Sequence, residues 1–367
     1  MIFKKNKYLE HFIALIILAS CSTISKNLKL DSVELSKKAN TKNFQEIYDY
    51  QSYFNNDLDT IQVAIDSLML NQEQLKDAKI LKRNYQKILS KEEYTLVLDP
   101  NNKYSIELIE LIYKQNLPIN IFWDEKKPSL LPENLLSQKI NGFCSSLYNE
   151  AIESINKEIN KSSDSTIIIY SEEYKSFIKS LELENSDFLA IKYDSNDIQA
   201  FSAEVLGVNS SESRFNKISN LNPNQNINFT PRPRSDFKQI VILLNPQEYK
   251  SMMPALRYHG GNRFKYLNFI SSLEEINSPL QLLDYEDSFT PMSNFIASKI
   301  QKDASISLEK FIELGALNEW LLIQILGQAG VQSAKINGIT GDIIYKANAC
   351  TQRQIPLLKI SSNLFSS

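Results

Sequence analysis

Histidine is almost absent from this chain. Only two of its 367 residues are histidines, and His11 lies in an N-terminal segment that we expect to be removed, which leaves His259. A Ser-His-Asp triad or a metal site with several histidines would have to be built around that single side chain. The sequence therefore argues against both kinds of site.

An excess of positive charge is also lacking. The chain carries 40 Lys and Arg residues against 43 Asp and Glu residues, a formal net charge of −3. A mildly acidic chain is a poor ligand for polyanions, so we expect no nucleic-acid partner. Neighbouring carboxylates such as Glu172 and Glu173, or Asp284 and Glu286, could do acid/base chemistry, but we interpret them as solvated surface. We expect no catalytic residue, no metal and no cofactor.

The N-terminus has no apolar run long enough to cross a bilayer. The run from Phe12 to Ala19 follows a lysine-rich start and has eight residues, whereas a spanning helix needs about 20. It ends in Leu18-Ala19-Ser20-Cys21, which resembles the bacterial lipobox. We therefore expect residues 1–20 to be a signal peptide and Cys21 to be acylated. A membrane-spanning helix and an ordinary buried cysteine are the alternatives.

Cysteine is scarce as well, with three in the chain. Besides Cys21 there are Cys144 and Cys350, which could pair in an oxidising compartment. Ser22 follows the lipobox cysteine, and the absence of Asp at this position favours the outer membrane, with the protein on its periplasmic face.

The region before the first expected strand divides into two parts. Residues 21–43 are rich in Lys, Ser, Asn and Thr, and we interpret them as a lipidated tether. Residues 44–93 carry apolar residues at helical spacing and predict a pair of amphipathic helices. These helices either cover a neighbouring core, which we favour, or form a partner-binding groove.

From residue 94 the pattern changes to alternating strands and helices. Apolar, β-rich runs predict strands at 94–98, 117–123, 165–170, 188–192 and 239–244. Helical patterns fall between them, at 105–115, 145–160, 172–181 and from 246 through Met253. Strands separated by helices predict parallel βαβ units. The polar stretch 209–228 is interpreted as a helix and loop.

Several later motifs resemble the LpoA family of penicillin-binding protein activators. The most specific are a basic block, Phe229 to Phe237, and a C-terminal hairpin, Ile336 to Gly341, followed by Cys350 and Arg353. Others are Leu206-Gly207-Val208 with Ser211 and Arg214, Asn245-Pro246, Met253-Pro254, Phe311 with Leu314 to Ala316, and Phe143-Cys144-Ser145 through Ala151. The resemblance covers residues 94–360.

The resemblance implies an α/β, two-lobed fold like the type I periplasmic binding proteins, with parallel sheets and a short helical segment in front. Lobe 1 would comprise residues 94–143 and 270–335, and lobe 2 residues 144–269 and 336–367. Cys144 would lie at the lobe crossover and Cys350 near the returning C-terminal strand, so we predict a disulfide between them.

The same resemblance implies a non-enzymatic outer-membrane lipoprotein that activates a class A penicillin-binding protein, a peptidoglycan synthase, by direct contact. Longer family members carry a large N-terminal helical domain, for which residues 22–93 are too few. The alternative function is that of a solute-binding lipoprotein with a small ligand between the lobes, and a third is that of a cell-wall hydrolase.

Arginine is concentrated in one region, because five of the seven arginines lie between Arg214 and Arg263. Arg232 and Arg234 either fasten their loop by bonding backbone carbonyls or Asp236, or form a patch that faces a partner. In the C-terminal hairpin, Gly338 and Gly341 flank Ile339-Thr340 and predict a tight turn with positive φ.

Overall fold

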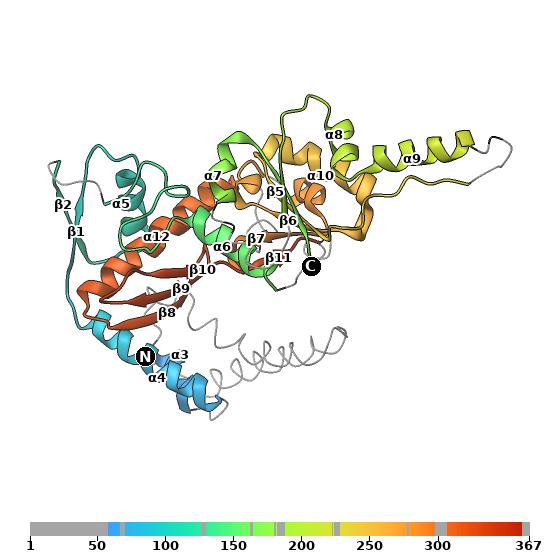
Figure 1. Cartoon of the computed structure of the whole chain (residues 1–367). Coiled ribbons are helices and arrows are strands. Elements are labelled where there is room, and N and C mark those ends of the chain that lie inside the picture. The colour runs from blue at the N-terminus through green and yellow to red at the C-terminus, as the bar shows by residue number, and fades with distance from the viewer. Residues whose placement is uncertain are drawn as a thin grey trace, which may run out of the picture. The chain divides into compact units, whose positions relative to one another are not determined.

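The computed structural model describes residues 58–66, 70–125, 130–161, 164–179, 181, 188–221, 223, 228–276, 279–297 and 307–361. Within these ranges the chain is a mixed α/β protein whose sheets are mainly parallel, as the alternating pattern predicts (Figure 1). The predicted signal peptide, the tether and the first part of the helical segment lie outside them.

Within the described ranges, two helices precede the first strand. They are α3, Leu58–Asp66, and α4, Gln72–Leu89. α4 begins with a capping box, in which the Asn71 side chain accepts from the Gln74 backbone N–H at 2.9 Å and the Gln74 side chain accepts from the Asn71 N–H at 3.0 Å. Its buried apolar residues, Ala78, Leu81, Tyr85 and Ile88, recur at helical spacing. α4 therefore covers a core through one face, as the favoured interpretation holds.

The first sheet has two parallel strands, β1, Tyr94–Leu98, and β2, Ile119–Trp123, joined by α5, Tyr104–Lys114. The outer edge of β1 is closed by a side chain rather than by a third strand. The Gln328 amide donates to the Thr95 carbonyl at 2.6 Å and accepts from the Thr95 N–H at 2.8 Å. This amide satisfies the edge groups that a neighbouring strand would otherwise pair.

The second sheet has six strands in the order β11-β7-β6-β5-β3-β4. They are β3 Thr166–Tyr170, β4 Phe188–Lys192, β5 Gln239–Leu243, β6 Lys265–Asn268, β7 Ser288–Pro291 and β11 Leu357–Lys359. The first five in sequence are parallel and β11 is antiparallel to β7. Every residue of β5 is buried, as a strand covered on both faces requires.

Helices and helical turns connect these strands. They are α6 Leu147–Ile159, η3 Glu172–Tyr174, α7 Lys175–Ile178, α8 Ile198–Val205, α9 Val208–Leu221, α10 Pro246–Gly260, η4 Gly261–Arg263, η5 Ile270–Leu273 and η6 Pro279–Tyr285. The helix predicted at 172–181 is thus a 3-10 turn followed by one short α-helical turn.

The third sheet is antiparallel and has the order β10-β9-β8. Its strands are β8 Ser333–Asn337, β9 Asp342–Lys346 and β10 Gln352–Gln354. The long helix α12, Leu308–Gln328, precedes it, and Gly315 of this helix lies against the turn between β8 and β9. A substituted Cβ at Gly315 would lie only 2.6 Å from Ile339 Cγ2, so helix and turn are in close contact.

The strands cross the lobe boundaries that the resemblance implies. β7 falls in the predicted lobe 1 range, 270–335, yet it pairs with β6 of the predicted lobe 2. Buried hydrogen bonds from Asn268 Nδ2 to Ser288 Oγ (2.5 Å) and Thr290 Oγ1 (3.0 Å) hold the two strands together. Residues 333–354 form their own sheet on both sides of the predicted boundary at 335/336, whereas β11 joins the large sheet.

Candidate functional site

The predicted lipidation site, Cys21, lies outside the described residues, as do the signal peptide 1–20 and the tether 21–43. Acylation of Cys21 therefore stays a prediction. Every helix within the described ranges is too short or too polar to traverse a bilayer.

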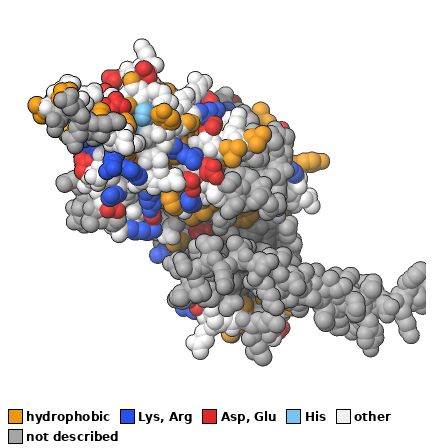
Figure 2. All heavy atoms as spheres, turned by 90° about the vertical axis from the view of Figure 1, so that its right-hand side faces the viewer, with side chains coloured by type: hydrophobic (Ala, Val, Ile, Leu, Met, Phe, Trp, Pro, Cys, Tyr) orange, Lys and Arg blue, Asp and Glu red, His pale blue; other side chains and the backbone are white. Residues whose placement is uncertain are grey.

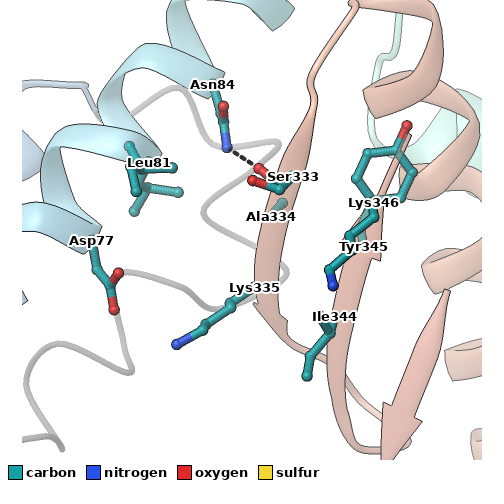
Figure 3. A pocket seen from close by; sticks show the side chains of 10 residues that line it. Asp77, Leu81, Asn84, Ser333, Ala334, Lys335, Ile344, Tyr345 and Lys346 are labelled. Carbon is teal, nitrogen blue, oxygen red and sulfur yellow. Dashed lines mark hydrogen bonds between the residues drawn. The ribbon is translucent and has the colours of Figure 1, made fainter. Parts of the chain in front are cut away.

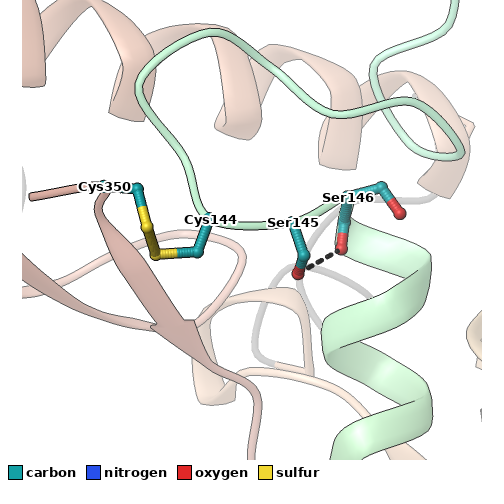
Figure 4. Close-up of a disulfide and its surroundings, with 4 residues drawn as sticks. All are labelled: Cys144, Ser145, Ser146 and Cys350. Atoms are coloured by element: carbon teal, nitrogen blue, oxygen red, sulfur yellow. Dashed lines mark hydrogen bonds between the residues drawn. A yellow bond between two sulfur atoms is a disulfide. The ribbon is translucent and has the colours of Figure 1, made fainter.

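Cys144 and Cys350 are joined by a disulfide, with an S–S distance of 2.11 Å and a Cα–Cα distance of 4.9 Å (Figure 4). Backbone hydrogen bonds hold the two segments side by side. The Cys144 N–H donates to the Thr351 carbonyl at 2.9 Å, and the Thr351 N–H donates to the Gly142 carbonyl at 2.8 Å. The bond therefore links the start of the α6 region to the C-terminal strands, across 206 positions of sequence.

A buried ion-pair group lies next to this disulfide, and we call it the arginine hub: Glu150, Glu319, Thr340 and Arg353. Arg353 donates to Glu150 at 2.6 Å and to Glu319 at 3.0 Å, and all three charged side chains are almost completely buried. The guanidinium also lies 4.3 Å from the centroid of the Phe143 ring. Burial raises the pKa of Glu150 to about 7, against the opposing effect of Arg353.

The hub also fixes the hairpin turn between β8 and β9. Glu319 Oε1 accepts from the Thr340 backbone N–H at 2.6 Å, and Glu319 Oε2 accepts from the Thr340 hydroxyl at 2.6 Å. Three elements, α6, α12 and β10, thus meet on one guanidinium and two carboxylates. Because these groups are bonded to one another and sealed from solvent, they serve the fold.

The two turn glycines are needed for a reason other than the predicted one. Neither Gly338 nor Gly341 has positive φ, so that prediction is wrong. A Cβ at Gly338 would lie 2.5 Å from Glu319 Oε1 and 2.6 Å from the Gly341 carbonyl oxygen. A Cβ at Gly341 would lie 2.7 Å from the Gln354 carbonyl oxygen. Close approach of neighbouring groups therefore excludes a side chain at both positions.

The structure separates the two arginines of the basic block. Arg234 donates to Asp236 through Nε (2.8 Å) and Nη2 (2.6 Å), and its guanidinium lies 4.5 Å from the Phe237 ring centroid. These hydrogen bonds lower the pKa of Asp236. The Arg234 N–H donates to the Leu206 carbonyl at 2.7 Å, so this residue fastens its loop. The exposed Arg232 side chain bonds no described residue, and only its backbone N–H reaches Ser211 Oγ, at 3.3 Å.

Arg232 belongs to a feature that we call the arm: α9 together with residues 228–238. Figure 1 shows α9 extending away from the six-stranded sheet. Only Val208 and Ser211 of this 14-residue helix are buried. The ring of Phe215 stacks on that of Phe229 with centroids 4.2 Å apart, which joins the helix to the returning segment.

The arm exposes both apolar and basic side chains. Ile218 is 56% exposed and Leu221 is 84% exposed. Arg214 and Lys217, which are also exposed, lie on the adjoining part of the same helix. The sequence predicted a helix and loop here, but it did not show that the described part of the chain would bury only two residues of this helix.

An aromatic group with a carboxylate lies at the carboxyl ends of the parallel strands. The Phe269 ring, after β6, has the rings of Tyr148, Tyr174 and Phe177 around it, with centroids 5.0 to 5.5 Å away. Tyr148 donates a hydrogen bond to Glu274. Burial raises the pKa of Glu274 to about 7, and the charges of Glu309, Glu313 and Glu173 add to this while Tyr148 opposes it.

The acidic residues considered as catalytic pairs lie on the surface. Glu172 is exposed and pairs with Lys175 at 3.1 Å and Lys192 at 2.9 Å. The described part of the chain contains no group of three or more His, Cys, Asp or Glu side chains placed to hold a metal ion. His259 follows Tyr258 near the end of α10, with its ring edge-on at 5.0 Å.

A mainly apolar groove of about 230 Å³ separates α4 from the outer face of β8 and β9 (Figure 3). Leu81 of α4 faces it from one side, and Lys335 and Ile344 face it from the sheet. The Asn84 amide bridges its floor by donating to the Ser333 carbonyl at 3.0 Å.

Neither the models of protein families nor the curated proteins contain a match to the chain.

The described residues provide exposed surfaces on the arm and a buried, mutually bonded group in the arginine hub. Sequence reasoning missed Glu319, which completes the hub. A signal for it does exist, because this carboxylate stands within the apolar stretch Ala316 to Ile325 of a helix that is buried nearly all round. A charged residue in such a helix needs a buried partner, which Arg353 supplies.

Proposed function

We propose that this protein is a non-enzymatic regulator of peptidoglycan synthesis, which activates a class A penicillin-binding protein by direct contact from the periplasmic face of the outer membrane. The arm is the observation that carries the proposal. A 14-residue helix with two buried residues is marginal in water unless another surface covers it. Its exposed Ile218 and Leu221, beside Arg214, supply what a protein contact needs.

The residues that carry the family resemblance support this proposal in two ways. The hairpin motif and Arg353 belong to one buried, mutually bonded unit, the arginine hub. Residues that carry the resemblance are therefore in contact with one another in the fold. The basic block forms the base of the arm, with Arg232 free to contact a partner.

A two-lobed fold like the type I periplasmic binding proteins belongs to the same proposal. Taken in sequence order, the five parallel strands of the large sheet are arranged 2-1-3-4-5, a common order in doubly wound α/β domains. The small sheet of β1 and β2, covered by α5 and α12, would represent the shortened first lobe.

The function is tested by capturing purified class A penicillin-binding proteins on the lipid-free protein and by assaying glycan-strand polymerisation and crosslinking. We expect capture, and faster crosslinking when the protein is added. A protein that neither captures a synthase nor changes its rate would contradict the proposal.

Variants of the arm sharpen this test. Arg232→Ala and the double variant Ile218→Ser, Leu221→Ser should weaken capture and leave the melting temperature unchanged, because these side chains contact solvent. Arg234→Ala should lower the melting temperature, because it loses Asp236 and Phe237. Ile106→Ser, on an exposed position of α5, is the matched control and should bind as the unaltered protein does.

A solute-binding lipoprotein is the second candidate function, and the aromatic group around Phe269 favours it. Aromatic rings and a carboxylate at the carboxyl ends of parallel strands are the usual components of a small-ligand site in an α/β sheet. Thermal stabilisation by an amino acid or a sugar, without capture of a synthase, would support this function over the first.

A further inference from the structure

The amino ends of the parallel strands form a pocket of about 370 Å³ on the opposite edge of the large sheet from the aromatic group. Its basic lining comes from positions far apart in the sequence: Lys238, Arg263, Lys265 and Lys359. Lys238 precedes β5, Arg263 and Lys265 stand at the start of β6, and Lys359 ends the antiparallel β11. The topology brings all four to one edge.

Positive charge exceeds negative charge in this pocket. Asp287 is the one carboxylate in its lining, and it pairs with Lys359 at 2.9 Å. Lys265 pairs with Glu158. Lys238 and Arg263 have no acidic partner among the described residues. This local excess of positive charge contrasts with the net charge of −3 of the whole chain. Figure 2 shows a face of the molecule on which Lys and Arg side chains gather.

The backbone holds like charges together here. The Lys265 N–H donates to the Lys238 carbonyl at 2.8 Å, which holds the residue before β5 next to the first residue of β6. Asp287 and Ile360 are joined in the same way, at 2.8 Å, which fixes the position of Lys359 beside them.

Aromatic side chains form the rest of the wall. Phe264, Tyr266 and Phe289 line the pocket, and the Lys265 ammonium lies 4.9 Å from the Phe289 ring centroid. A volume of this size falls at the lower end of the range for small-molecule sites, roughly 300–1,000 Å³. It holds more than a bare ion and suits an anionic group with a small organic remainder.

We propose that this pocket binds a phosphate monoester or diester. Lysine ammonium groups supply point charges for phosphate oxygens, and the guanidinium of Arg263 supplies a planar set of donors. The phosphate could belong to a phospholipid headgroup or to a free small molecule, and the chemistry is the same for both. Lys238 is the last residue of the arm, and the other residues of the lining lie outside it. The inference does not depend on the function proposed above.

The test uses the lipid-free protein and two kinds of probe. Calorimetric titration with glycerol 3-phosphate measures binding of a free phosphate ester. Co-sedimentation with phosphatidylglycerol vesicles, compared with phosphatidylcholine vesicles, measures binding of a headgroup. Binding of the free ester alone assigns a soluble ligand, and binding of the anionic vesicles alone assigns a headgroup.

The variant Lys238→Gln, Arg263→Gln removes two cations that hold no ion pair, so the fold should remain intact. We expect it to weaken binding at least about tenfold, the worth of one charge-assisted hydrogen bond. Arg83→Gln, Lys346→Gln removes the same charge from exposed positions elsewhere and should leave the affinity unchanged. Equal weakening by both variants would show unspecific charge attraction and overturn the proposal, as would failure of every probe to bind the unaltered protein.

Discussion

At the scale of single residues, the stability of the arginine hub depends on the charges that it buries. One guanidinium faces two carboxylates, and all three side chains are nearly inaccessible to water. Burial disfavours the charged form of Glu150 and raises its pKa to about 7, although the nearby Arg353 guanidinium opposes this shift. Arg353 is therefore the group that offsets the cost of burying the Glu150 carboxylate.

Replacing Arg353 by methionine should destabilise the protein by about 3–5 kcal/mol, because two buried carboxyl groups lose their partner. Urea unfolding followed by circular dichroism measures the change. Arg83→Met, at an exposed position of α4, is the matched control and should change the free energy of unfolding by less than about 0.5 kcal/mol. Equal effects of the two variants would mean that the hub contributes nothing.

Glu274 makes the stability of the folded protein depend on pH. Its folded-state pKa of about 7 lies above the ordinary value of 4.5, so the folded protein holds a proton that the unfolded chain has lost between these values. Its contribution to stability is present below about pH 4.5 and declines as pH rises towards 7. Ionisation of Glu274 thus penalises the folded state at neutral pH.

The variant Glu274→Gln should remove this part of the pH dependence. Glutamine keeps an oxygen that can accept from Tyr148 and carries no charge. We expect the variant to match the unaltered protein at pH 5 and to be the more stable of the two at pH 8, in urea unfolding at four pH values between these limits. A constant difference across the series would contradict the assignment.

At the scale of elements, helix propensity and tertiary packing favour different residues at one of the two glycine positions of α12. α12 contains two glycines with very different neighbours. A Cβ at Gly315 would lie 2.6 Å from Ile339 Cγ2, whereas a Cβ at Gly327 would lie 3.5 Å from the Tyr345 hydroxyl, an ordinary contact. Helix propensity alone favours alanine at both positions.

Gly327→Ala should therefore be neutral or stabilising, by up to about 1 kcal/mol. Gly315→Ala should destabilise by about 1–3 kcal/mol, because the turn between β8 and β9 must move to admit the methyl group. Thermal unfolding of the two variants side by side provides the comparison. Similar melting temperatures would show that the helix and the turn are not packed as closely as the contact at Ile339 implies.

Comparing predicted with observed bounds shows which elements the local sequence pattern specifies. The runs at Tyr94–Leu98 and Phe188–Lys192 form strands with the predicted bounds, because short apolar β-rich runs specify extended backbone. The pattern at 172–181 predicts a longer helix than forms. There, Tyr174 and Phe177 turn towards Phe269, a contact that no local pattern contains.

At the scale of the whole molecule, the Cys144–Cys350 disulfide joins two segments that lie far apart in the sequence. It closes a loop of 206 positions, which removes unfolded-state entropy worth roughly 5 kcal/mol in the chain-entropy model. It also fixes Phe143 and Thr351 beside the arginine hub. The hub and the disulfide should therefore stabilise the same junction.

The double variant Cys144→Ser, Cys350→Ser should unfold at a clearly lower temperature than the oxidised protein. Adding a reductant should lower the melting temperature of the unaltered protein and leave that of the variant unchanged. Thiol titration of unreduced material should find neither sulfur free. Two titratable thiols at these positions would rule the bond out.

The sequence by itself determined the strands Tyr94–Leu98 and Phe188–Lys192 and the alternation of parallel strands with helices. Periodicity and short-range hydrogen bonds decide these, and they act over a few residues. Tertiary structure alone decided that Glu150, Glu319 and Arg353 meet and that β7 joins the large sheet. It also decided that Arg234 binds its loop while the Arg232 side chain bonds none of the described residues. Such contacts depend on burial and on strand pairing between segments that are far apart in the sequence. The spacing of residues along the chain therefore does not predict them.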